Sequence, residues 1–271
     1  MPNYICTTCG AQFPDTPDAP DGCPICLDDR QYVNPAGQQW TTPLAMAETG
    51  YANSFRPLEP NLSGIGIEPK FAIGQRALLV QTPRGNILWD CVPYLEEDVT
   101  VPVIERLGGI DAIAISHPHF YTGMAEWSRA FGNVPIYLHE SNREWVMRPT
   151  TAIEYWSGDH FSPWDGITLV RCGGHFPGST VLHWPAGAGG RGVLLTGDTI
   201  YVVADRRFAS FMYSYPNLVP LSAAAVQGIW QAVQPFEFDR LYAGWADAVM
   251  QNDAKALVQR SVERYLRHIS P

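Results

Sequence analysis

The sequence contains no long hydrophobic run and no excess of basic side chains. Its longest apolar run is five residues, Ile200–Ala204, whereas a membrane-spanning helix needs about 20. With 18 basic against 27 acidic side chains the formal net charge is −9, so the summed field repels phosphate backbones and anionic membrane surfaces. We therefore expect no membrane and no nucleic acid among its partners.

The first residues also lack the features of a secretion signal. The opening Met-Pro-Asn-Tyr-Ile-Cys has neither a charged n-region nor an apolar h-region, so we expect a cytoplasmic protein. A hydrophobic fraction of 46% and a charged fraction of 17% exclude disorder for most of the chain. The 271 residues suffice for one large domain with a small appendage.

Four of the six cysteines form two tight pairs near the N-terminus. Cys6-Thr-Thr-Cys9 and Cys23-Pro-Ile-Cys26 are separated by thirteen residues, a spacing at which two such turns share one tetrahedral ion. The segment between them carries three prolines and no usable apolar period, so its folding should depend on the metal. We predict a structural zinc ribbon over residues 1–34, which could also dock a protein partner.

Other forms of this cysteine cluster stay open. Cys9-Gly10 and Cys23-Pro-Ile-Cys26 resemble part of the rubredoxin turns, which hold an electron-transferring iron, although Leu27 stands where those turns have glycine. A disulfide or a metal-free form is a further alternative. The two remaining cysteines, Cys91 and Cys172, are expected to be buried thiols.

Beyond the ribbon, residues 35–69 are punctuated by proline and glycine and are predicted to be a linker and lead-in to a large domain over residues 35–271. Short β-branched runs then predict strands at 77–82, 86–91, 112–116, 136–139, 167–172, 180–184, 193–196 and 241–243. Helical patterns occur at 102–107, 124–131, 143–147, 223–233 and 254–269. Strands interleaved with helices predict a layered α/β fold.

The residues suited to catalysis follow the predicted strands. The strand at 112–116 ends directly in His117-Pro118-His119, and Pro118 favours extended backbone at His117. Residues two apart in an extended chain project to the same side, so both imidazoles could bind one metal. His175 and Asp198 each lie on a glycine-flanked turn after another strand, where layered sheets gather their sites.

Over roughly residues 70–270 these motifs resemble the metallo-β-lactamase superfamily. The resemblance implies a four-layer αββα sandwich with metals at one edge. It matches His117 and His119 to the first two histidines of the family motif HxHxDH, His175 to the third metal histidine, and Asp198 to the carboxylate that normally bridges two metals. This chain departs from the motif in three places, because Tyr121 and Thr122 replace Asp-His and Trp245 replaces the last histidine.

These departures remove the ligands private to a second metal and none that belong to the first. We predict a mononuclear site of three histidines and Asp198 that holds zinc or iron, with a second ion left open. The resemblance favours hydrolysis of an ester, thioester, amide or lactone. The alternatives are a mononuclear iron redox enzyme resembling the persulfide dioxygenases, and a non-catalytic binding module. Tyr121 either bonds a developing oxyanion or fills the space left by the second metal.

Overall fold

The computed structural model describes residues 2–269 and divides the chain into two compact units. The first unit contains the residues up to Leu138 together with Arg143–Tyr155, and the second contains His139–Asn142 and the residues from Trp156 onward. Within residues 2–269, no helix has both the length and the apolar character needed to cross a membrane.

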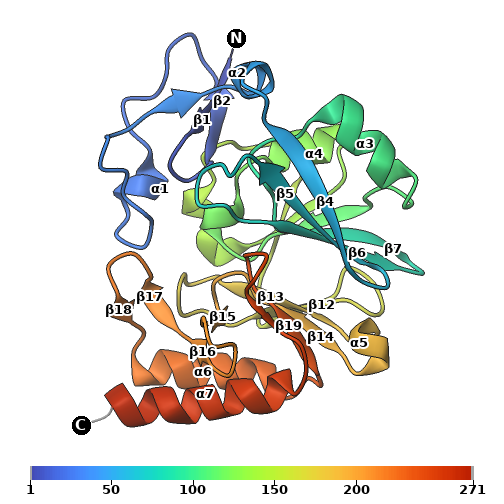
Figure 1. Cartoon of the computed structure of the whole chain (residues 1–271), viewed down its shortest axis with the longest axis vertical. Coiled ribbons are helices and arrows are strands. Elements are labelled where there is room, and N and C mark those ends of the chain that lie inside the picture. Colours follow the sequence, from blue (N-terminus) through green and yellow to red (C-terminus); the bar gives the residue numbers. More distant parts are fainter. Residues whose placement is uncertain (1, 270–271) are drawn as a thin grey trace. The chain divides into compact units, whose positions relative to one another are not determined.

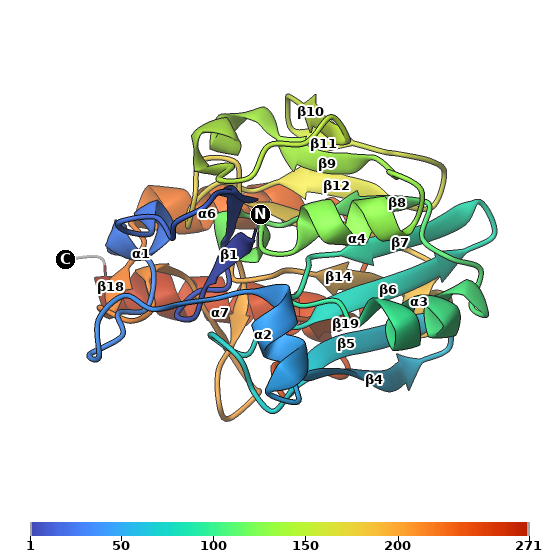
Figure 2. The ribbon, with the colours of Figure 1, turned by 90° about the horizontal axis from the view of Figure 1, so that it is seen from above.

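The first unit is built on a seven-stranded sheet (Figure 2). Neighbouring strands run antiparallel from β4 to β7, whereas β7, β8 and β9 are parallel. Helices α3 (Glu97–Glu105) and α4 (Met124–Ala130) cover one face, where Ile104, Ile113 and Trp127 are fully buried in one core. In spatial order the strands are β10 (Ile153–Trp156), β9 (Ile136–His139), β8 (Ala112–Ala114), β7 (Gly85–Trp89), β6 (Ala77–Thr82), β5 (Leu62–Glu68) and β4 (Ala52–Glu59).

The cysteine-rich ribbon belongs to this first unit. Its sheet has the order β2-β1-β3, formed by Asn3–Cys6 (β1), Gln12–Asp15 (β2) and Trp40–Thr41 (β3). A short helix α1 (Pro24–Leu27) carries the second cysteine pair. The cysteines share a small core with Phe13 and Ile25, and the ring of Phe13 meets Trp40 edge to face. The ribbon therefore folds as a packed substructure around the cysteine cluster.

The segment 35–69, expected to be a linker, contains regular structure. It forms β3, the helix α2 (Pro43–Glu48) and the long hairpin β4–β5. Pro57 lies in the edge strand β4, next to an irregularity in the pairing with β5, and both are places where a strand tolerates proline. Gly66 leaves space for Ser54, whose Oγ would lie 3.0 Å from an added Cβ. The proline and glycine that suggested a linker are thus features of a hairpin at the sheet edge.

The second unit contains a six-stranded sheet with two long helices. Helices α6 (Ala223–Val233) and α7 (Ala254–Ile269) lie side by side (Figure 1) and bury Val226, Ile229 and Val258 against the sheet. Only β14 and β19 are parallel among the paired strands that the structure describes in this sheet. In spatial order the strands are β11 (His160–Phe161), β12 (Thr168–Arg171), β13 (Thr180–Trp184), β14 (Val193–Leu195), β19 (Arg240–Tyr242) and β20 (Val249–Met250).

Most predicted elements are confirmed, and two helices need correction. The strands β6, β9 and β13 and the helices α6 and α7 have the predicted bounds. The helix expected at 102–107 runs from Glu97 to Glu105, so Pro102 lies inside it and not at its first position. The helix expected at 143–147 is a 3-10 segment, Glu140–Trp145. The remaining short elements are α5 (Gly187–Gly190), β15 (Tyr201–Val202), β16 (Ala209–Ser210), β17 (Met212–Ser214) and β18 (Val219–Pro220).

Candidate functional site

The first unit brings two predicted metal ligands together just beyond the end of β8. His117 has extended backbone, with φ −170° and ψ 174°, and Pro118 then opens a 3-10 turn, Pro118–Phe120. The rings of His117 and His119 have centroids 4.9 Å apart, and each offers a nitrogen within 4.8 Å of the other's. Both side chains are buried. The predicted extended backbone is present at His117, whereas His119 lies inside the 3-10 turn, so the turn and not the alternation of an extended chain brings the two rings together.

A buried network fixes the ring of His117. The Ser116 hydroxyl lies 2.9 Å from His117 Nδ1, and the backbone N–H of Ser116 donates to Asp90 Oδ1 at 2.8 Å. With Nδ1 held by Ser116, Nε2 is the nitrogen that the ring presents to a metal. Sequence reasoning missed Ser116 and Asp90, and the signal available was a serine directly before the first histidine.

The second unit holds the other two predicted ligands. His175 Nε2 lies 3.8 Å from Asp198 Oδ2. The Nδ1–H of His175 donates to the backbone carbonyl of Met212 at 3.1 Å, because a carbonyl can only accept, so Nε2 again faces the carboxylate. Tyr215 donates its hydroxyl hydrogen to the Asp198 carbonyl at 2.8 Å. Burial, reinforced by the Asp198 charge, raises the pKa of Tyr215 well above its usual value.

The donor atoms of both pairs suit a first-row divalent ion. Ligands about 2.1 Å from one ion are roughly 3 to 3.5 Å apart, and the separation in the His175–Asp198 pair is close to this range. Imidazole nitrogen binds zinc and iron alike, and carboxylate oxygen is acceptable to both. Each pair therefore supplies two of the four ligand types expected for the predicted site of three histidines and one aspartate.

The four ribbon cysteines form a second donor set. Cys6 Sγ lies 3.6 Å from Cys26 Sγ, and Cys9 Sγ lies 3.6 Å from Cys23 Sγ. Sulfurs 2.3 Å from a tetrahedral zinc would be about 3.8 Å apart, so the cluster needs little adjustment to bind it. Burial raises the pKa of the Cys9 thiol above its usual value. The distances exclude disulfides, and all six cysteines are free thiols in the structure.

N–H groups also point to the sulfurs of this cluster. Gln38 Nε2 donates to Cys6 Sγ at 3.2 Å, and the backbone N–H of Ala11 donates to Cys9 Sγ at 3.5 Å. Such bonds stabilise thiolates and therefore favour the metal-loaded form of the ribbon.

The ribbon also contains a charged pair. Asp28, directly after α1, accepts two hydrogen bonds from the guanidinium of Arg30, at 2.6 and 2.7 Å. Although burial alone would raise the pKa of Asp28, the hydrogen bonds and charge of Arg30 hold it below its usual value.

The three positions that depart from the family motif have other roles. The ring of Tyr121 is packed into the core of the first unit and is 7% exposed. Thr122 donates its hydroxyl hydrogen to the Cys91 carbonyl at 3.1 Å, and Trp245 packs edge-on against Tyr201. The ring of Tyr121 thus has packing contacts of its own, and its role in catalysis stays a prediction.

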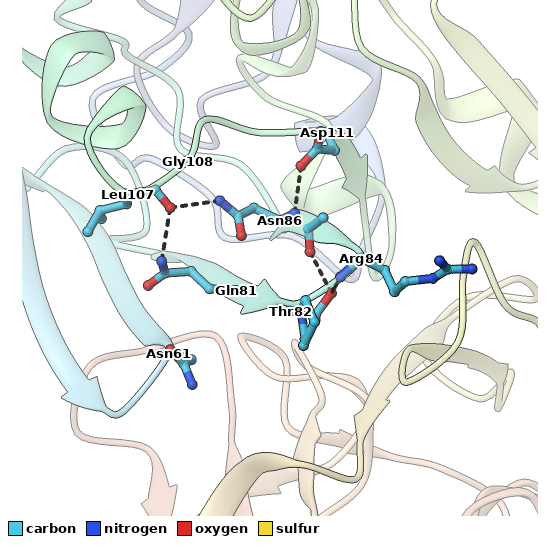
Figure 3. Close-up of a pocket in the computed structure, with 10 residues that line it drawn as sticks. Asn61, Gln81, Thr82, Arg84, Asn86, Leu107, Gly108 and Asp111 are labelled. Atoms are coloured by element: carbon cyan, nitrogen blue, oxygen red, sulfur yellow. Dashed lines mark hydrogen bonds between the residues drawn. The ribbon is translucent and has the colours of Figure 1, made fainter.

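The first unit also contains a cavity of about 540 Å³ away from the histidine pair (Figure 3). It lies where β7 and β8 begin, whereas His117 follows the end of β8. The amides of Gln81 and Asn86 both donate to the Leu107 carbonyl, and Asp111 accepts the backbone N–H of Asn86. These polar groups bind neighbouring loops to the sheet, so we assign this cavity a structural role.

Comparisons with known proteins agree with these observations. The sequence profile of the metallo-beta-lactamase superfamily matches residues 73–245. The protein described as "Uncharacterized protein YmaE" of Bacillus subtilis is 50% identical over 271 residues, which is 100% of this chain and 98% of that protein. The DIM-1 metallo-beta-lactamase has a TM-score of 0.57 at 14% identity, over 80% of this chain and 98% of its own. A Cronobacter sakazakii metallo-beta-lactamase with a HARLDQ motif has a TM-score of 0.52 at 18% identity, over 79% and 92%. Both structures show a shared fold.

Proposed function

Because this chain belongs to the metallo-beta-lactamase superfamily, we propose that it is a metal-dependent hydrolase whose site holds one ion through His117, His119, His175 and Asp198. The family match, residues 73–245, spans all four residues. The observation that carries the proposal is the buried His117–His119 pair, whose ring nitrogens lie within 4.8 Å of each other where the extended His117 leads into a 3-10 turn. His175 and Asp198 supply the second half of the same ligand set.

A single ion is proposed because the positions private to a second ion hold none of the aspartate and histidine side chains of the family motif. Tyr121 is packed in the core, and the Thr122 hydroxyl bonds a backbone carbonyl. Trp245 has only an indole N–H, which can donate but cannot bind a cation. The ribbon cysteines are proposed to hold a separate, structural zinc, since all four sulfurs are protein ligands and leave no position for substrate.

The proposed substrate is an ester, thioester, amide or lactone. When bound, zinc would polarise the substrate carbonyl and lower the pKa of a bound water to about 7. Two groups of the protein orient the histidine rings. The Ser116 hydroxyl contacts Nδ1 of His117, and the Met212 carbonyl accepts a hydrogen bond from Nδ1 of His175. Asp198 provides a carboxylate that can accept a proton. Tyr121 is proposed to act through packing, and Tyr121→Phe should keep turnover within about threefold.

The proposal is tested on the zinc-loaded full chain with a panel of activated esters, thioesters, anilides and lactones. We expect turnover of at least one class, with kcat/KM reduced by about 10²-fold or more in His175→Ala and in Asp198→Asn, because each removes a metal ligand. His160→Ala is the matched control, since His160 is exposed on β11 of the same unit and should leave kcat/KM unchanged.

Two other outcomes would contradict the hydrolase assignment. Purification of the chain with iron at the histidine site, together with oxygen uptake, would support a mononuclear iron redox enzyme instead. A loaded histidine site without turnover of any substrate class would support a binding module.

A further inference from the structure

We propose that the ribbon is a positioning element of the histidine site, in which its Cys9–Gln12 turn clamps the loop that holds His117 and His119. The inference rests on the proposed function, because it concerns the same metal ligands. It goes further by assigning a role to residues at the ribbon turn, at the Asp90–Tyr94 loop and at Thr122.

The ribbon turn fits tightly against Pro93. Gly10 has φ +81°, and a Cβ added there would lie 2.3 Å from Pro93 Cγ. Glycine is therefore required both by the left-handed backbone and by the close approach. Gln12, itself buried, donates from Nε2 to the Pro93 carbonyl at 3.0 Å, and Gln75 Nε2 donates to the Cys9 carbonyl at 3.4 Å. The turn is thus bound to the Asp90–Tyr94 loop and to the body of the first unit.

The same Asp90–Tyr94 loop holds the histidine segment. Asp90 accepts the backbone N–H of Ser116, whose hydroxyl contacts His117 Nδ1. At the other end of the segment, Thr122 donates to the Cys91 carbonyl, and Trp127 Nε1 donates to the Val92 carbonyl at 3.1 Å. A displacement of this loop would therefore move both ends of the segment that carries the two imidazoles.

The side chain of Thr122, which follows the histidine pair, lies next to the ribbon turn. Its Cγ2 would lie 3.3 Å from a Cβ at Gly10. This position matches the final histidine of the family motif, where an imidazole would have to share the space with the ribbon turn. The small threonine instead lets the ribbon turn lie against the loop that follows His119.

The geometry of the ribbon turn depends on its own metal cluster. Cys9 directly precedes Gly10, and Cys9 Sγ lies 3.6 Å from Cys23 Sγ. An ion shared by the four sulfurs would fix the backbone of Cys9 and Gly10, whereas buried thiols without a cation would not hold the turn as firmly. Metal in the ribbon should therefore increase the affinity of the histidine site for its own ion.

The test is a titration of metal-free full chain with Co²⁺. Thiolate-bound cobalt gives strong charge-transfer absorption, whereas cobalt on nitrogen and oxygen ligands gives only weak d–d bands, so the two sites are read separately. We expect Gly10→Ala to keep the thiolate absorption and to weaken cobalt binding at the nitrogen and oxygen site by about 10-fold or more, a range typical of lost supporting contacts.

Gly37→Ala is the matched control. Gly37 has φ +83°, so the substitution carries the same backbone strain, but nothing lies within 4 Å of an added Cβ. We expect its cobalt affinities to equal those of the unchanged chain. Gln12→Glu serves as the second variant, because it removes the N–H that donates to the Pro93 carbonyl, keeps an oxygen for the hydrogen bond from Arg148 and adds no backbone strain. It should also weaken the nitrogen and oxygen site.

Unchanged affinity at the nitrogen and oxygen site in the Gly10 and Gln12 variants would overturn the clamp and leave the proposed function intact. Only thiolate-type cobalt in the unchanged chain would overturn the proposed metal site itself, and the clamp with it.

Discussion

The orientation of His117 depends on the single hydroxyl of Ser116, which is fully buried beside Nδ1. We expect Ser116→Ala to weaken metal binding at the histidine site by about 10- to 100-fold, because the ring loses the group that fixes its direction. Isothermal titration with zinc, after the ribbon site is filled, measures the change. Ser128→Ala is the matched control, since Ser128 is also buried in the first unit and its hydroxyl donates to the Val134 carbonyl. Equal affinities in both variants would show that Ser116 does not orient the ring.

The sequence identified those site residues whose side chain can bind a metal and whose position, shortly after a predicted strand, also points to a site. His117 and His119 follow a strand and flank a proline, and His175 and Asp198 follow strands on glycine turns. Asp90 could not be recognised in this way, because its role depends on a φ of +62° after β7. The support of His175 was equally hidden, because it comes from the main-chain carbonyl of Met212, for which side-chain type gives no signal.

Helix α6 offers a test of how secondary structure is specified in the second unit. Its N-cap is Ser222, whose hydroxyl accepts the Ala225 N–H. We expect Ser222→Ala to lower the free energy of unfolding by about 1 kcal/mol and Ser222→Asp to preserve it, because aspartate caps equally well. Thermal unfolding of the metal-loaded chain measures both. An alanine variant as stable as the aspartate variant would show that the cap contributes little.

Helices could be predicted from the sequence where the spacing of apolar residues follows a single helical period. Helices α6 and α7 have a clear apolar stripe, and the predicted bounds coincide with the observed ones. The hairpin β4–β5 could not be recognised, because Pro57 in the edge strand β4 and the glycines of β5 are residue types that usually indicate loops. The turn between these strands also uses Asn61 at φ +66°. Whether a strand tolerates these residues depends on which strands lie beside it in the fold, and the sequence of the segment alone does not show this.

At the scale of the whole molecule, the family match and the ribbon cover different parts of the chain. The superfamily profile begins at residue 73, whereas the Bacillus subtilis relative aligns along all 271 residues. The residues that form the ribbon and the β4–β5 hairpin in this chain therefore lie within the region aligned to that relative. This agrees with a ribbon that is bonded to the first unit through Gln12 and Gln75.

The most direct test of the account is an anomalous-scattering map from crystals of the full chain grown with zinc. We predict two ions per chain, one among Cys6, Cys9, Cys23 and Cys26 and one bound together by His117, His119, His175 and Asp198. A second ion beside Tyr121, or a histidine pair whose zinc has no contact with His175 and Asp198, would contradict it.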